Sequence, residues 1–229
     1  MKKKILIILS IVVAFILGGV LSFIVFKDKG LSKLPKPELT GGERGSLGID
    51  KNINEQTIDK YLNRSDSVYI DVRMLKDAAN WEKINGDSYL SGFVSGFEVL
   101  PYPYLVDDSI STELESIVGK GYQGKSLFKN VSGKYVANYE ESLNILEYFF
   151  PKDKYIFLMC GGGGYAGQTK KLLVSLGWDE SKIYDVGGYW FYDGANKVSV
   201  KREENGKSVY DFWKATYHNI DFSSLKEVQ

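Results

Sequence analysis

The chain has 229 residues, of which 44% are hydrophobic and 25% are charged. This composition is typical of a globular protein with about one domain. Basic and acidic residues number 29 each, and beyond residue 29 the balance is 24 basic to 28 acidic, which gives no reason to expect a nucleic acid partner. The only cysteine, Cys160, and the only histidine, His218, argue against an intrachain disulfide and a transition-metal site. We expect no metal and no cofactor.

A long apolar run lies near the N-terminus. Residues 5–26 are 22 uncharged, mostly apolar residues that follow three lysines. As a helix, this run is about 33 Å long, enough to cross a hydrocarbon core of about 30 Å. The lysines predict a cytoplasmic N-terminus and an extracytoplasmic domain, although Lys27 and Lys29 weaken the asymmetry. Residues 1–29 are therefore predicted to be a single-pass anchor in the cell membrane.

The alternative for this segment is a cleaved signal peptide. Such peptides usually have an apolar region of about 7 to 15 residues and a small-residue cleavage site. The run here is longer, no clean A-x-A follows it, and no cysteine nearby can accept a lipid, so a retained anchor is favoured. Residues 30–48 are rich in proline, glycine and charge, which predicts a linker that ends near Ile49.

Helices and strands are expected to alternate within the domain, residues 49–194. The first half is predicted to hold a short helix at 54–62, a strand at 67–72, an apolar stretch at 93–100 and an irregular insertion at 105–138 with one short helix near 112–118. The second half is predicted to hold a helix at 139–150, a strand at 155–159, a helix at 165–176 and a strand at 182–186. This alternation predicts an α/β fold with a mainly parallel sheet flanked by helices. Residues 195–229 are expected to pack on the domain as an extension.

Cys160 lies where a strand passes into a helix. Open α/β sheets bind ligands at such strand ends. The helix dipole and unpaired N–H groups there stabilise negative charge and are expected to lower the pKa of a thiol. The glycines at 161–164 carry no side chains, so their amides can form an anion cradle around a thiolate or a sulfur oxyanion. The alternative is an inert buried cysteine beside a tight turn.

Three other loop motifs come close to matching. Gly162, Gly164 and Gly167 fit G-x-G-x-x-G with Asp185 about twenty residues later, but too little chain follows for further βαβ units. The same stretch differs from a P-loop because Gln168 takes the place of the lysine. A phosphatase-type C-x5-R loop fails because Ala166 takes the place of the arginine.

Four blocks of the sequence, in this order, together resemble the rhodanese domain over residues 54 to 194. The blocks are VYIDVR at 68–73, similar to a strand ending in D-V-R; LSGFVSGFEVLP at 90–101, similar to G-H-I-x-G-A-x-N-I-P; the strand, cysteine loop and helix at 155–176; and IYDVGGYW at 183–190, similar to V-x-x-L-x-G-G-x-x-x-W. The resemblance implies a sulfurtransferase in which Cys160 takes a sulfane sulfur from a small donor, holds it as a persulfide and passes it to a thiophilic acceptor. It assigns the amide cradle, and so the substrate-binding role, to Gly161, Gly162, Gly163, Gly164 and Tyr165.

The chain departs from the family pattern at two positions. Phe93 replaces the histidine of the second block, and Tyr165 stands where catalytic rhodaneses commonly have an arginine. No positive charge appears in the loop before Lys170, which argues against a preference for thiosulfate and leaves a neutral or organic persulfide open. Asp71 and Arg73 are interpreted as structural residues that brace the strand end.

His218 and three aromatic residues are further candidates for a role in chemistry. His218 has no second ligand or nucleophile close in sequence and is expected to have a surface or capping role. Trp190, Phe191 and Tyr192 either form the wall of a pocket or belong to the core, and aromatic clusters favour the core.

The sequence leaves two hypotheses about function. The first is a membrane-anchored sulfurtransferase that works through a Cys160 persulfide. The second is a rhodanese-like module that lost turnover and recognises a partner or senses redox state.

Overall fold

The computed structural model describes residues 31–41, 47–73, 92–106 and 125–229 of the chain. It divides into two units, Met1–Leu34 and Pro35–Gln229, and the sheet and the cysteine loop lie in the second. The predicted membrane segment at 5–26 and the short helix near 112–118 lie outside the described residues. Within the described ranges, no helix combines the length and the apolar character needed to span a bilayer.

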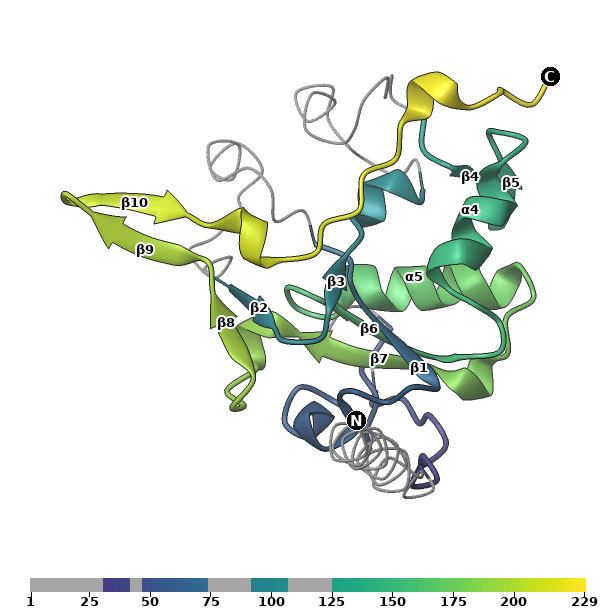
Figure 1. Cartoon of the computed structure of the whole chain (residues 1–229). Helices are drawn as coiled ribbons and strands as arrows, with labels where there is room; N and C mark the ends of the chain where they lie inside the picture. The colour runs from purple at the N-terminus through teal and green to yellow at the C-terminus, as the bar shows by residue number, and fades with distance from the viewer. Residues whose placement is uncertain (1–30, 42–46, 74–91, 107–124) are drawn as a thin grey trace, which may run out of the picture. The chain divides into compact units, whose positions relative to one another are not determined.

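A four-stranded parallel sheet forms the centre of the second unit (Figure 1). Its strands lie in the order β3 (Glu98–Val99), β1 (Ser67–Asp71), β6 (Tyr155–Cys160) and β7 (Ile183–Gly188). β6 lies between two neighbours, and its last five residues are buried, as expected for a strand covered on both faces. The predicted mixed α/β fold with a parallel sheet is therefore confirmed.

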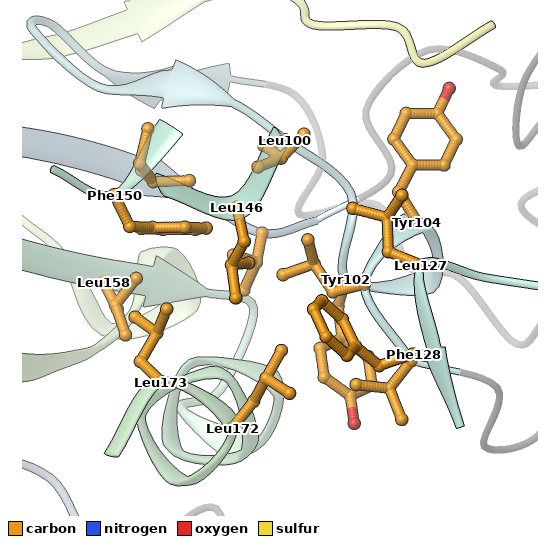
Figure 2. Packing of buried hydrophobic residues seen from close by; sticks show 14 of the residues in the cluster. Leu100, Tyr102, Tyr104, Leu127, Phe128, Leu146, Phe150, Leu158, Leu172 and Leu173 are labelled. Carbon is orange, nitrogen blue, oxygen red and sulfur yellow. The ribbon is translucent and has the colours of Figure 1, made fainter. Parts of the chain in front are cut away.

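Two α-helices pack on one face of the sheet. These are α4 (Ser142–Phe149) and α5 (Gly164–Ser175), and α5 ends just before Gly177, whose φ of +95° suits a helix stop. Leu146 of α4 and Leu173 of α5 share one buried cluster with Leu158 of β6. Figure 2 shows Leu158 and Leu173 side by side in this cluster, so burial of apolar surface holds the helices to the sheet.

Aromatic rings cover the opposite face of the sheet. Side chains alternate along a strand, so Phe157 points away from the helices that Leu158 contacts. The Phe157 ring stacks on Tyr69 at 5.0 Å and on Tyr184 at 4.9 Å between centroids. The segment around η1 (Ile58–Tyr61) lies on this side, opposite α4 and α5 (Figure 1). Cys160, two residues after Leu158, therefore belongs to the face that the helices cover.

Three predicted elements differ from the structure. The apolar stretch at 93–100 forms two short strands, β2 (Gly92–Val94) and β3, because a turn with Gly96 at φ +93° separates them. The helix predicted at 54–62 is only the 3-10 turn η1. The insertion at 105–138, predicted to be irregular, contains an antiparallel hairpin of β4 (Phe128–Val131) and β5 (Lys134–Ala137). Its turn places Ser132 and Gly133 at positive φ, as a two-residue hairpin loop requires.

The packed unit begins earlier than the boundary expected near Ile49. The Thr40 amide donates to the Ile49 carbonyl at 2.8 Å, and the Tyr184 hydroxyl donates to the Pro35 carbonyl at 2.6 Å. The Asp50 amide donates to the Asp185 carbonyl at 2.7 Å. Much of the expected linker is therefore bonded to itself and to the domain, at the outer side of β7.

The C-terminal residues pair with the early strands. β8 (Lys197–Ser199) runs antiparallel to β2, and the Val99 amide of β3 donates to the Thr216 carbonyl at 2.8 Å. This pairing covers the outer edge of the short strand β3. The other elements of the described residues are η2 (Tyr102–Tyr104), η4 (Glu180–Lys182), η5 (Tyr189–Phe191), the hairpin strands β9 (Lys201–Glu204) and β10 (Lys207–Tyr210), η6 (Phe212–Lys214) and η7 (Phe222–Ser224).

Candidate active site at the end of β6

Cys160 is the last residue of β6 and lies at the entrance to α5. Residues 161–163 form the loop, and Gly163 precedes the helix with a φ of +102°, a conformation that favours glycine. The Cys160 side chain is 3% exposed and lies in the same buried cluster as Leu158 and Ala166. The structure thus places the only thiol at the carboxyl end of a central parallel strand, beneath the first turn of a 12-residue helix.

Backbone amides point at the sulfur of Cys160. The Gly163 amide donates to Sγ at 3.0 Å, and the Ala166 amide lies close enough to lower the pKa of the thiol. Burial nevertheless raises the pKa of the thiol, and the carboxylates of Asp185 and Asp71 raise that pKa further, while the two amides lower it. The predicted lowering of the pKa is therefore wrong in its net direction, because desolvation outweighs the amides.

The loop glycines are packed closely against the end of β7. The Trp190 amide donates to the Gly161 carbonyl at 3.1 Å, and a Cβ on Gly161 would lie 2.5 Å from the Trp190 ring. A Cβ on Gly188 would overlap the Gly161 carbonyl and the Gly162 Cα. Of the predicted cradle, only the Gly163 amide is seen to contact the sulfur, while Gly161 and Gly162 provide close packing.

Gly164 and Tyr165, the last two residues of the predicted cradle, begin α5. The Tyr165 ring is 44% exposed and stacks on Tyr102 at 4.7 Å between centroids. The Tyr102 hydroxyl donates to Gln168 Oε1 at 2.8 Å, one turn further along the helix. Tyr165 therefore presents an aromatic ring at the entrance to α5.

Trp190 and Phe191 follow the Gly187-Gly188 pair and are 43% and 48% exposed. The Trp190 ring lies over the loop at Gly161 and Gly162. Tyr192, by contrast, is buried, and its hydroxyl donates to Asp59 Oδ1 at 2.6 Å. The three aromatic residues thus divide between the rim of the site and the core.

A buried ion pair lies at the end of β1. Arg73 Nη2 is 2.5 Å from Asp71 Oδ2, and both side chains are at most 4% exposed. Arg73 also donates to the Gly92 carbonyl at 3.1 Å, and its guanidinium lies 4.3 Å from the centre of the Tyr189 ring. These contacts agree with the bracing role that the sequence predicts for Asp71 and Arg73.

A second buried ionisable group lies on β7. Burial raises the pKa of the Asp185 carboxyl to about 8, against the Gly187 amide and Lys170, which lower it. Its Oδ1 accepts from the Gly187 amide at 2.9 Å, and its Oδ2 has no hydrogen-bond partner among the described residues.

A cavity of about 320 Å³ lies beside α5 and not at Cys160. Its lining includes Leu39, Leu47, Gly167, Lys170, Val174 and Asp185.

His218 and Phe93 lie away from the cysteine loop. His218 Nε2 is 2.7 Å from Glu98 Oε2, and its ring packs on Phe149, so it has a role in packing at the edge of β3. Phe93, in the place of the family's histidine, is buried with Val99 and Val200. In the part of the chain that the structure describes, no three histidine, cysteine or acidic side chains are arranged to hold a metal ion.

Three contributors to the site were not predicted from the sequence. The Ala166 amide was not predicted because every residue except proline carries a backbone N–H, so the residue type does not reveal which amide lies near the sulfur. Tyr102 follows Pro101 in the second block, but nothing local indicates that it stacks on Tyr165. Asp185 did give a signal, since a carboxyl within the apolar strand sequence at 183–186 must be buried.

Comparison with known proteins gave no match. Neither a family model, nor a curated protein, nor a solved structure is significantly similar to this chain. The features of this chain that indicate a function are therefore the geometry around Cys160 and the four sequence blocks.

Proposed function

We propose that the protein is a sulfurtransferase of the rhodanese type, in which Cys160 carries a sulfane sulfur as a persulfide. The observation that supports this most is the thiol at the end of β6, with the Gly163 amide 3.0 Å from Sγ at the start of α5. Amides at a helix N-terminus stabilise an anionic sulfur atom, which is the form that both the thiolate and the deprotonated persulfide take.

The arrangement of the remaining blocks supports the same proposal. The D-V-R block ends β1 with the buried Asp71–Arg73 pair, and β1 lies directly beside β6. The closing block ends β7 with Gly188 packed on the cysteine loop, and β7 is the other neighbour of β6. The rhodanese-like interpretation thus accounts for which strand ends surround Cys160.

The proposed reaction has two displacement steps. The Cys160 thiolate attacks the outer sulfur of a donor R–S–S⁻, a new S–S bond forms, and the bond within the donor breaks to release RS⁻. A thiophilic acceptor such as cyanide then attacks the outer sulfur of the persulfide, leaves as thiocyanate and restores the thiolate. In the second step the carbon of cyanide supplies the electron pair of the new C–S bond, and the pair of the broken S–S bond stays on Sγ. One bond forms and one breaks in each step, so no further oxidant or reductant is needed.

A second candidate function has one observation in its favour. Cys160 is only 3% exposed, and its pKa is raised by burial, both of which slow attack by a thiolate. These features favour a rhodanese-like module that binds a partner or senses redox state without turnover. For the enzyme, they imply that the cover over the loop must move before a donor reaches Sγ.

Mass spectrometry of the intact protein separates the two functions. The full-length protein in detergent micelles is incubated with sulfane-sulfur donors, and a mass increase of one sulfur atom is sought. An enzyme gains this sulfur on Cys160 and transfers it to cyanide, and Cys160→Ser gains none. A native thiol that no donor modifies, but that reacts after unfolding, would support the binding module instead.

We also propose that residues 5–26 anchor the domain on the extracytoplasmic side of the cell membrane. The support is the 22-residue apolar run behind three lysines. Protease added to intact cells should remove the domain. Recovery of a mature N-terminus beyond residue 20 would show cleavage and overturn the anchor.

A further inference from the structure

The cysteine loop carries no basic side chain. The residues between Cys160 and Gln168 are five glycines, a tyrosine and an alanine. Among the described residues near the loop, Arg73 is paired with Asp71, Lys170 lies 3.9 Å from Glu180, and Lys197 lies 5.3 Å from the centre of the Tyr189 ring. A doubly charged donor therefore finds no basic side chain within the loop to offset its charge. Each charge removed from the donor lowers the cost of bringing it to the buried sulfur.

The exposed side chains at the loop are aromatic. Trp190 lies over Gly161 and Gly162 and is 43% exposed. Tyr165 is 44% exposed, and its ring is held by stacking on Tyr102. Aromatic faces gain from contact with apolar and aromatic groups and offer little to a hydrated dianion. Tyr165 follows the loop at the start of α5, and Trp190 reaches the loop from η5, after β7.

We propose that the sulfur donor is an organic sulfane-sulfur compound with at most one negative charge, whose apolar group packs against Trp190 and Tyr165. This inference rests on the proposed function and narrows its donor class. The absence of a basic side chain in the loop disfavours thiosulfate, and the two rings select for the organic group. Tyr165 and Trp190 are then residues that determine specificity, and Cys160 remains the residue that reacts.

Three donors separate the effect of the donor's charge from the effect of its organic group. Thiosulfate carries two charges, methanethiosulfonate carries one charge and a methyl group, and benzenethiosulfonate carries one charge and a phenyl ring. With each thiosulfonate, the Cys160 thiolate attacks the terminal sulfur, an S–S bond forms, and the sulfur–sulfonyl bond breaks to release the sulfinate. Thiosulfate reacts in the same way and releases sulfite.

The measurement is the rate at which Cys160 of the full-length protein gains one sulfur atom. Each rate is divided by the rate of the same donor with N-acetylcysteine, which removes the intrinsic reactivity of the donor. We expect benzenethiosulfonate to react faster than methanethiosulfonate by about twofold to tenfold, the range expected from one aromatic contact. Thiosulfate should be the slowest of the three, by about tenfold or more relative to benzenethiosulfonate.

Variants assign the selectivity to its residues. Trp190→Ala should reduce the advantage of the phenyl donor over the methyl donor, because one aromatic wall is lost. Tyr165→Arg should raise the relative rate of thiosulfate by about tenfold, because it supplies the missing positive charge. Trp213, which is 80% exposed in η6, provides the matched control, and Trp213→Ala should change neither ratio.

The possible outcomes separate a failure of the donor class from a failure of the proposed sulfurtransferase function. If Cys160 gains sulfur and thiosulfate is as fast as benzenethiosulfonate or faster, the donor class is wrong and the sulfurtransferase stands. If no donor loads the native thiol, although Cys160 accepts sulfur after unfolding, the proposed function is overturned and the donor class with it.

Discussion

The neighbouring strands β1 and β6 end side by side, but the polar groups at the two ends find different kinds of partner. The Val72 amide just after β1 donates to the Met159 carbonyl of β6 at 2.8 Å, so the two ends are in contact. β1 ends in opposite charges that pair with each other, Asp71 and Arg73. β6 ends in a thiol that accepts a hydrogen bond from the backbone amide of Gly163. One end is an ion pair between two side chains, and the other is a buried thiol that we propose to be the nucleophile.

The comparison predicts that the brace contributes most to stability. In Arg73→Leu, the Asp71 carboxylate is left buried without its counterion, which should lower the free energy of unfolding by about 3–5 kcal/mol. Urea unfolding of the full-length protein measures this loss. Lys125→Leu removes an exposed pair with Glu227 and should change the free energy of unfolding by less than about 1 kcal/mol. Equal losses in the two variants would contradict the brace.

Asp185 adds a third strand end to this comparison. It is a buried carboxyl on β7 that raises the pKa of the Cys160 thiol. The unfolded pKa is near the ordinary 3.8 and the folded pKa is about 8. Between these values, the folded state keeps a proton that the unfolded state releases. Stability should therefore fall as pH rises through this window, by at most about 1.4 kcal/mol per pH unit, and level off above about pH 8.

Asp185→Asn should remove this slope, because its amide does not titrate and its Oδ1 can still accept from Gly187. Urea unfolding of both proteins at a series of pH values from 5 to 9, spaced by about one pH unit, tests the difference. The same slope in the wild type and in the variant would show that Asp185 is not the group responsible.

Gly188 links β7 to the cysteine loop. A Cβ at this position overlaps the Gly161 carbonyl and the Gly162 Cα, so Gly188→Ala should cost about 1–3 kcal/mol of stability and displace the loop. At Gly41 a Cβ has open space, and Gly41→Ala serves as the control in the same chemical unfolding series. A stable Gly188→Ala protein with unchanged Cys160 reactivity would show that this contact does not position the loop.

Trp190 gives the smallest expected effect, which is on access alone. Trp190→Ala removes the ring that covers Gly161 and Gly162, so alkylation of native Cys160 by iodoacetamide should become a few-fold faster. Trp213→Ala should leave the alkylation rate as it is. If the rate is unchanged in Trp190→Ala as well, the tryptophan is not the cover over the thiol.

The regular elements around the site could be predicted because local patterns determine them. The expected strand at 155–159 and helix at 165–176 correspond to β6 and α5, since an apolar run, a glycine loop and a glycine stop define them in sequence. The hairpin of β4 and β5 was missed because its strands are largely exposed and polar, which gives no clear alternation.

The site itself could be predicted only in part. The sequence places Cys160 directly before the start of a helix. How deeply the thiol is buried depends on how Leu158, Ala166 and Trp190 pack around the loop, and no local sequence pattern predicts that packing. The direction of its pKa shift follows from that burial and from Asp185, which lies 25 residues away. Helix-dipole reasoning alone therefore gave the opposite sign.

The central claim is that the end of β6 accepts sulfur while the end of β1 only braces it. The most direct measurement is the intact mass of the folded full-length protein after exposure to benzenethiosulfonate. The account predicts one added sulfur atom, located on Cys160 by peptide mapping, released as thiocyanate by cyanide and absent in Cys160→Ser. A folded protein whose mass does not change, although iodoacetamide still reaches Cys160, would contradict it.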